Sequence, residues 1–386
     1  MRRDQLEAEN GNHRGRRRGL RVLVLCADIG EGHVTVARTL ARDLTARHDV
    51  EAVELHADLS VLGPRLGRFL TNGFRTHLEE VGWTYELAYR VFFEMALPRL
   101  AGHLALAILG GRGLRRTIAA FQPDVVVTEY PVLSAALGQL RALGRMPVPV
   151  CSSISDPAGL YYWAHPGIDR HLLSWQESLP EVERIAGVGR ATAVRPLVDR
   201  RFLTAMPRAA ARAALELPER QPIVLVSGGG WGIGDLRGAS EVALASAPDT
   251  TVVALAGRSE PTRRALLEPH RGNERVRVLG FTDRMPALLA AADAIIHTTG
   301  GTTALEARAV GCPLVNYGTG VAHVRAHARA MAEQGLAEWA PDRQALAPAL
   351  ARAMSGRRPR PLAVDALPDA ASVVVAVAHT RSNGAR

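Results

Sequence analysis

At 386 residues the chain is long enough for two domains, each with a hydrophobic core of its own. Its 47 basic residues are all arginine and outnumber 38 acidic ones, so the net charge of +9 favours anionic partners such as nucleotide phosphates or an acidic membrane surface. Because the chain has no lysine, a Schiff-base lysine and a Walker-type phosphate loop are excluded.

Residues 1–19 carry six arginines against three acidic residues and show no apolar periodicity, so we expect a disordered basic arm. No apolar run reaches the ~18 residues of a membrane-spanning helix, and no secretory leader is expected. The three cysteines are widely spaced and fit no zinc pattern, so we expect small buried residues in a reducing compartment.

The segment 20–195 alternates short β-branched runs with longer amphipathic ones, which is typical of a parallel sheet with crossover helices. The expected strands are LRVLVLC from Leu20, VEAVEL, DVVVTEY and VPVCSSIS, and the first expected helix begins near Thr35. These elements predict one Rossmann-like domain.

The same alternation returns in 196–356, with expected strands IVLVSGG, TVVALAG, VRVLGF, AIIHTT and PLVNYG. The sequence therefore predicts an α/β protein of two Rossmann-like domains, whose ligand site lies in the cleft at the carboxyl ends of the strands. The tail 357–386 contains the short apolar segment SVVVAVAH, which suits packing back on the first domain.

Two glycine-rich turns lie between a strand and a helix in the second domain, SGGGWGIGD at 227–235 and HTTGGTTALEARAVGCP at 297–313. Glycine lets backbone N–H groups approach a phosphate, and a helix N-terminus adds positive potential. Glu306 lies one turn inside the second helix, where a carboxylate can accept both hydroxyls of a ribose. The alternative is that Thr302 caps the helix and Glu306 lies on a solvated face.

The segment SDPAGLYYWAHPGIDRHLLS at 155–174 holds aromatic, histidine and aspartate side chains beyond what a connector needs, although an interdomain packing loop remains the alternative. No Asp-x-Asp pair occurs in the chain, so we expect no metal and no cofactor. Helix ends and arginines would then have to neutralise a leaving diphosphate.

Four motifs together resemble the inverting GT-B glycosyltransferases, which include the diacylglycerol glycosyltransferases and the N-acetylglucosaminyltransferase of peptidoglycan lipid synthesis. They are ADIGEGHVTVARTL from Ala27, the segment at 155–174, SGGGWGIG with GFTDRMPALLAAADAII, and TTGGTTALEARAVGCPLV. The resemblance covers about 20–340 and implies a GT-B fold, with two parallel sheets facing an interdomain cleft.

The resemblance also implies roles for individual residues. The backbone near Phe281 and Thr282 would bind uracil, Glu306 would bind ribose, and His33 would face the acceptor and the anomeric carbon. The diphosphate would be held by Gly229, Gly230, Gly300, Gly301, Thr302 and Thr303.

One departure from the family follows the strand PLVNYG. The family has Pro-Gly-Gln-Glu-x-x-Asn there, whose Gln and Glu hold sugar hydroxyls, whereas this chain has TGVAHVRAHARA at 319–330. His323 and Arg325 are candidate replacements, and a solvated helix face is the alternative. The donor sugar is therefore left open.

The resemblance implies transfer of a hexose from a UDP-sugar to a lipid, most simply diacylglycerol or a related glycolipid, with inversion of configuration. His33 would be the general base, because imidazole titrates near neutral pH. Asp156 and His165 are the competing candidates. A UDP-sugar epimerase of the same fold, or a non-catalytic UDP-binding partner subunit, are the alternative functions.

Residues 60–120 hold eight arginines against four glutamates and seven of the aromatic residues: Phe69, Phe74, Trp83, Tyr85, Tyr89, Phe92 and Phe93. Such a surface suits an anionic bilayer, so a cytoplasmic protein peripherally associated with the inner face of the cell membrane is expected. A helical pair with an aromatic core of its own is the alternative. Nucleic acid is not an expected partner, because no reader motif accompanies the charge.

Overall fold

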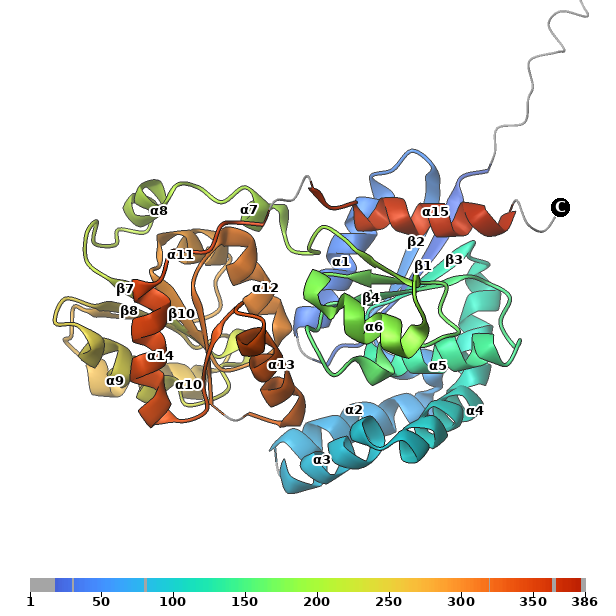
Figure 1. Ribbon diagram of the computed structural model, residues 1–386, viewed down its shortest axis with the longest axis horizontal. Helices are drawn as coiled ribbons and strands as arrows, with labels where there is room; N and C mark the ends of the chain where they lie inside the picture. The colour runs from blue at the N-terminus through green and yellow to red at the C-terminus, as the bar shows by residue number, and fades with distance from the viewer. Residues whose placement is uncertain (1–17, 30, 80–81, 319, 363–365, 383–386) are drawn as a thin grey trace, which may run out of the picture.

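The computed structural model describes residues 18–29, 31–79, 82–318, 320–362 and 366–382, which form two parallel sheets of six strands each (Figure 1). The strand order is β2-β1-β3-β4-β5-β6 in the first sheet and β12-β11-β10-β7-β8-β9 in the second. Both are doubly wound orders, and their topological switch points lie between β1 and β3 and between β7 and β10.

The first sheet is built from strands of three to seven residues, and its central strands are buried along their length because helices cover both faces. The strands are β1 (Leu20–Leu25), β2 (Val50–His56), β3 (Val125–Thr128), β4 (Val150–Ile154), β5 (Arg170–Leu173) and β6 (Ala191–Ala193). The helices are α1 (Glu31–Thr45), α2 (Pro64–Glu79), α3 (Gly82–Tyr89), α4 (Ala96–Phe121), α5 (Pro131–Ala142) and α6 (Leu179–Ala186).

The second sheet repeats this plan. Its strands are β7 (Ile223–Ser227), β8 (Thr251–Leu255), β9 (Val276–Leu279), β10 (Ala294–His297), β11 (Leu314–Tyr317) and β12 (Glu338–Ala340). Its helices are α7 (Arg200–Leu203), α8 (Arg208–Ala214), α9 (Leu236–Ser246), α10 (Glu260–Leu267), α11 (Met285–Ala291), α12 (Gly301–Val310), α13 (Ala322–Glu333) and α14 (Arg343–Ser355).

The last helix, α15 (Ala370–Ser382), lies across the first sheet rather than the second (Figure 1). Its residues Val374 and Ala378 are buried in the same core cluster as Val22 of β1 and Leu40 of α1. Strands β1 to β6 fall within 20–195 and β7 to β12 within 196–356, while the domain boundaries themselves stay a prediction. Most of the expected arm 1–19 lies outside the described residues.

Helix α1 begins at Glu31, four residues before the helix expected from Thr35. Nothing between these positions breaks a helix, and Gly32 suits this place because a Cβ added there would overlap the hydroxyl of Thr302 in the other half. His33 therefore lies in the first turn of a helix, where its side chain is held in place, and not in the preceding loop.

Candidate active site

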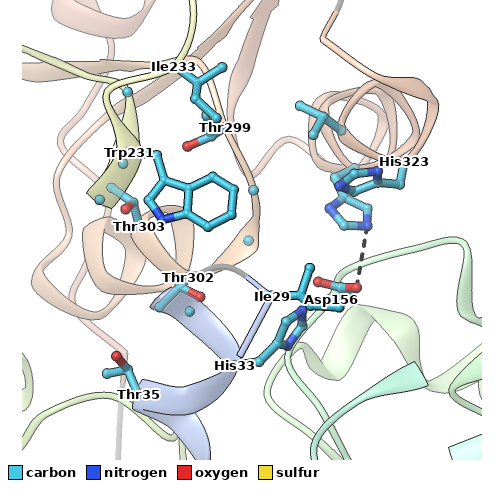
Figure 2. Close-up of a pocket in the computed structure, with 18 of the residues that line it drawn as sticks. Ile29, His33, Thr35, Asp156, Trp231, Ile233, Thr299, Thr302, Thr303 and His323 are labelled. Atoms are coloured by element: carbon cyan, nitrogen blue, oxygen red, sulfur yellow. Dashed lines mark ion pairs between the residues drawn. The ribbon is translucent and has the colours of Figure 1, made fainter. Parts of the chain in front are cut away.

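A cavity of about 990 Å³ lies between the two sheets and is lined by residues of both halves (Figure 2). The segments that follow β1, β3, β7 and β10 all contribute to its wall. These four strands flank the switch point of each sheet, so the cavity lies where doubly wound sheets bind ligands.

His33 lies in the cavity wall between the rings of Tyr130 and Trp163, whose centroids are 5.3 and 5.6 Å from its own. Its Nδ1 is 3.7 Å from Oε1 of Glu129, a carboxylate buried directly after β3. Burial lowers the pKa of His33, but the interaction with Glu129 and the charge of Asp156 outweigh it and raise the pKa above its ordinary value. His33 is thus a stronger base than a free imidazole.

Glu129 was not identified from the sequence. Burial raises the pKa of its carboxyl, and the neighbouring His33 opposes that rise. The signal for it was present in DVVVTEY, because an acidic residue that directly follows a fully buried parallel strand lies at the ligand-binding edge of the sheet.

Asp156 also lies in the cavity wall, where it accepts a 2.9 Å hydrogen bond from Nε1 of Trp163. Its Oδ2 is 3.9 Å from Nε2 of His327, an ion pair drawn dashed in Figure 2. Burial raises the pKa of Asp156, but the charges of His327 and His33 lower it below the ordinary value. The carboxylate of Asp156 is therefore ionised, and Trp163 and His327 already contact it.

The third base candidate, His165, does not line the cavity. Its Nε2 is 3.2 Å from Oε1 of Gln139, and its Nδ1 accepts a hydrogen bond from the backbone N–H of Gly167. Burial lowers the pKa of His165 to about 4. The structure brings two of the three predicted base candidates together, His33 and Asp156, and leaves His165 in the packed interior of the first half.

The nine residues predicted to hold the nucleotide all line this cavity: Gly229, Gly230, Phe281, Thr282, Gly300, Gly301, Thr302, Thr303 and Glu306. Gly229 has a φ of +65°, and a Cβ at Gly257 would lie 2.5 Å from the carbonyl oxygens of Gly229 and Gly230. Backbone of this kind admits a ligand close to the chain, as a phosphate requires.

The N-termini of α1 and α12 face each other across the cavity, as the approach of Gly32 to Thr302 indicates. Unpaired N–H groups and aligned peptide dipoles give each helix start a partial positive charge. Two such ends at one place favour a doubly charged anion such as a diphosphate.

Glu306 lies one turn into α12 and lines the cavity. Burial and the charge of Asp199 raise the pKa of Glu306 to about 8. Near the same end, the guanidinium of Arg258 stacks on Phe281 at 3.7 Å from the ring centroid, while 55% of Phe281 remains exposed. An exposed ring beside backbone amides suits a planar base.

Of the two replacements proposed for the sugar-binding residues, His323 lines the cavity and Arg325 does not. Arg325 forms an ion pair with Glu86 of α3 in the first half. His327 lies one turn after His323 and lines the cavity where Arg325 does not. The spacing of the two histidines in AHVRAHA, four residues apart, predicts that they share one helix face.

Another part of the wall of the same cavity is apolar and holds Phe69, Leu70, Tyr89, Phe92 and Phe93. The ring of Phe93 is stacked between those of Tyr89 and Tyr162, with centroid distances of 4.7 and 4.5 Å. The side chains of Phe74, Trp83 and Tyr85 lie outside the described residues. One continuous cavity thus joins a polar, glycine-rich half to an aromatic entrance.

Within the described part of the chain, no group of three or more His, Cys, Asp or Glu side chains is arranged to hold a metal ion. No single helix there meets the length and hydropathy needed to cross a membrane. One bent pair, Glu86–Glu94 with Ala96–Phe121 at 91°, meets them jointly, by length and composition only.

Similarity to solved structures covers nearly the whole chain. MurG of Acinetobacter baumannii superposes with a TM-score of 0.56 at 18% identity, covering 92% of this chain and 99% of that one. The chain has the GT-B fold. The GT-B fold also includes the UDP-GlcNAc 2-epimerase of Neisseria meningitidis bound to UDP-GlcNAc, which superposes with a TM-score of 0.56 at 12% identity over 94% of this chain and 100% of that one. The fold class predicted from the sequence is confirmed.

Sequence comparison points to the activity class within GT-B proteins. Residues 237–355 match the family described as glycosyl transferases group 1. A processive diacylglycerol beta-glucosyltransferase of Bacillus subtilis (strain 168) is 24% identical over 312 residues, which are 77% of this chain and 77% of that protein. The predicted resemblance is confirmed, and these matches support a transferase of the glycosyltransferase type.

Proposed function

We propose that the protein transfers a hexose from a UDP-sugar to the hydroxyl of a lipid, most simply diacylglycerol or a related glycolipid, with inversion at the anomeric carbon. The observation that carries this proposal is the single cavity of about 990 Å³. Its glycine-rich half suits a nucleotide diphosphate, its aromatic half suits an apolar acceptor, and His33 lies between them.

His33 serves as the general base in this proposal. As the acceptor oxygen attacks the anomeric carbon, its proton passes to the imidazole, and the bond between that carbon and the β-phosphate oxygen breaks. Glu129 is a positioning residue: it contacts Nδ1 of His33, orients the imidazole and raises its basicity. A positioned base contributes on the order of 10²–10⁴ in rate.

The lipid acceptor would enter past the α2–α4 layer, which Figure 1 shows on the side of the first sheet opposite α15. Helix α4 exposes a row of apolar side chains at the spacing of one helix face: Leu97, Leu100, Leu104 and Ile108. Helix α2 exposes Arg65 and Arg68, and α4 itself exposes Arg112, Arg115 and Arg116. This pattern supports peripheral docking on an anionic membrane, which we place at its inner face.

The test is a matrix of UDP-glucose, UDP-galactose and UDP-N-acetylglucosamine against diacylglycerol and a total lipid extract, with products read by mass spectrometry. The expected result is one hexose-bearing lipid for at least one donor. His33→Ala should lower turnover at least about a hundredfold while UDP binding is kept, and turnover like the wild type would remove His33 from the mechanism.

A UDP-sugar epimerase is the second candidate, because the epimerase fold neighbour superposes over nearly the whole chain. An epimerase interconverts UDP-sugars without any acceptor, so a new UDP-sugar formed by protein and donor alone would favour it. A UDP-binding subunit without activity would give neither product. The aromatic entrance beside His33 favours the transferase, since an epimerase has no lipid to admit.

A further inference from the structure

Positive side chains are scarce around the diphosphate end of the cavity, although the chain carries a net charge of +9. Among the described residues that line the cavity, Arg201 is the one arginine. Its guanidinium is paired with Asp199 and donates to the backbone carbonyl of Asp283, near the base-binding end. Of the two sources of positive charge expected from the sequence, the cavity wall thus supplies the helix starts of α1 and α12 but one arginine, and the chain has no lysine, so a further cationic side chain would add to the helix ends.

Two histidines occupy the place where such a side chain would act. His323 and His327 project from adjacent turns of α13, line the cavity, and lie with ring centroids 5.7 Å apart. In Figure 2 the dashed line joins the ring of His327 to Asp156 of the first half, with His323 beside it on α13. Gly301, the first residue of α12, lies beside this group, since a Cβ there would be 3.5 Å from Oδ1 of Asp156.

The protein alone does not satisfy the ring of His327. The residue is 3% exposed, its Nε2 is 3.9 Å from the Asp156 carboxylate, and its Nδ1 has no hydrogen-bond partner among the described residues. An unpartnered buried nitrogen costs free energy unless a further acceptor arrives. A phosphate oxygen of a bound donor would be such an acceptor after a small rotation of the ring.

The charged groups around this pair favour uptake of a proton once an anion is bound. Burial and the neighbouring His327 lower the pKa of His323 to about 4, with Asp156 and Glu86 opposing and His33 adding to the effect. The start of α13 is also positive, and Arg325 beside the pair is bound to Glu86. The two negative charges of a bound diphosphate would raise the pKa of His323 and so favour the protonated ring.

We propose that His323 and His327 neutralise the leaving diphosphate, taking up a proton from solvent when the donor binds, with Asp156 positioning His327 from the opposite half. This inference rests on the proposed function. When the bond between the anomeric carbon and the β-phosphate oxygen breaks, the electron pair stays on the phosphate, and the imidazolium meets the added charge. His33 separately receives the proton of the acceptor hydroxyl.

Isothermal titration of the full chain with UDP-glucose at pH 7, in buffers of different ionisation enthalpy, counts the protons exchanged. The wild type should take up about one proton more per ligand than the His323→Gln/His327→Gln variant, and Glu306 contributes equally to both. As the pH is lowered from 8 to 6, the Kd of the wild type relative to that of this variant should also fall, by up to about tenfold per pH unit. Glutamine keeps a hydrogen-bond donor but cannot be charged.

Three controls make the outcome decisive. Uridine, which lacks phosphates, should give equal proton counts with both proteins, and His48→Gln on the exposed loop after α1 should behave as the wild type. Each single variant is measured too, in case the double variant unfolds. The same titrations are run with UDP-galactose and UDP-N-acetylglucosamine. Equal proton counts for all proteins with a donor that binds would overturn the inference alone, whereas a wild type that binds none of the three UDP-sugars would overturn the proposed function.

Discussion

Two carboxylates at the site differ in their surroundings, because Glu129 is fully buried behind the cavity wall and Glu306 lies in that wall. Glu129 lies beside His33 and raises the basicity of that ring, whereas burial and the charge of Asp199 raise the pKa of Glu306 itself to about 8. A group whose pKa is moved this far in a cleft belongs to a functional site more often than a surface carboxylate does. Each therefore gives a separate prediction.

Glu129→Gln should move the acid limb of the pH–rate profile to lower pH. The carboxylate opposes the effect of burial on the pKa of His33, so without it burial lowers that pKa. A weaker base should also lower kcat at the optimum by about tenfold or more. Steady-state rates across pH 5–9 measure both effects, and an unmoved acid limb with unchanged kcat would contradict the pairing. UDP binding at pH 8 serves as the control and should not change.

Glu306→Gln should stabilise the unliganded protein at high pH. The pKa rises from 4.5 to about 8 on folding. The folded state therefore holds a proton that the unfolded chain has released, and the free energy of unfolding falls as pH rises between these values. Scanning calorimetry of the variant at pH 8.5 should give a Tm higher by roughly 2 °C or more, with little change at pH 4.5.

The same substitution should weaken UDP binding about tenfold, because a carboxylate makes stronger hydrogen bonds to ribose than an amide does. Glu274→Gln, at an exposed site outside the cavity, is the matched control for both measurements. If the Tm of Glu306→Gln equals that of the wild type at every pH, the pKa of Glu306 is not raised by folding.

At the scale of elements, helix α4 is unusual because one face lies on the core and the opposite face is apolar as well. Leu97 is 80% exposed and Ile108 is 59% exposed, while Leu114 of the same helix is fully buried. A row of exposed leucines is costly in water and suits a surface that lipid covers.

Leu100→Glu/Leu104→Glu should lower binding to liposomes containing anionic lipid at least tenfold, since it replaces apolar contacts by charges that the bilayer repels. Vesicle sedimentation at low and high salt measures this. Val188→Glu is the matched control, because Val188 is 87% exposed on a loop away from α4. Wild-type binding that is absent or insensitive to salt would argue against a membrane-docking face.

On the scale of the whole molecule, the two halves meet through contacts that also surround the cavity. Arg308 of α12 pairs with Glu177, Arg325 of α13 pairs with Glu86, and Gly32 lies against Thr302. The relative placement of the halves thus sets the distance between the base and the donor site. A side chain at Gly32 would hold them apart.

Gly32→Ala should lower kcat/KM about tenfold although alanine favours the helix by about 1 kcal/mol. The added Cβ would overlap the Thr302 hydroxyl and prevent this approach of the halves. A double-mutant cycle with Thr302→Ala measures the effect, because removing the hydroxyl should restore part of the loss. Additive losses in the double variant would show that the two residues act independently.

The sequence by itself determined the two alternating halves, the glycine turns and the order of the motifs, because strand runs buried on both faces, glycine turns and helix starts are set locally. From these follow the GT-B fold, confirmed by MurG and related structures, and the nine nucleotide-side residues that line one cavity. Three short strands escaped prediction: β6 and β12 have three residues each, too few to show a period, and β5 lies inside the segment 155–174, which was interpreted by its polar and aromatic side chains.

Tertiary structure alone decided which side chains meet. Glu129 lies 96 positions from His33 in the chain, yet β3 pairs directly with β1 and brings the carboxylate behind the imidazole. His165 and Arg325 stand in suitable motifs but face the interior and α3, whereas His327 faces the cavity beside Asp156 of the other half. Side-chain pairing between distant segments depends on strand order and on how the two sheets face each other, and neither is encoded at any single position.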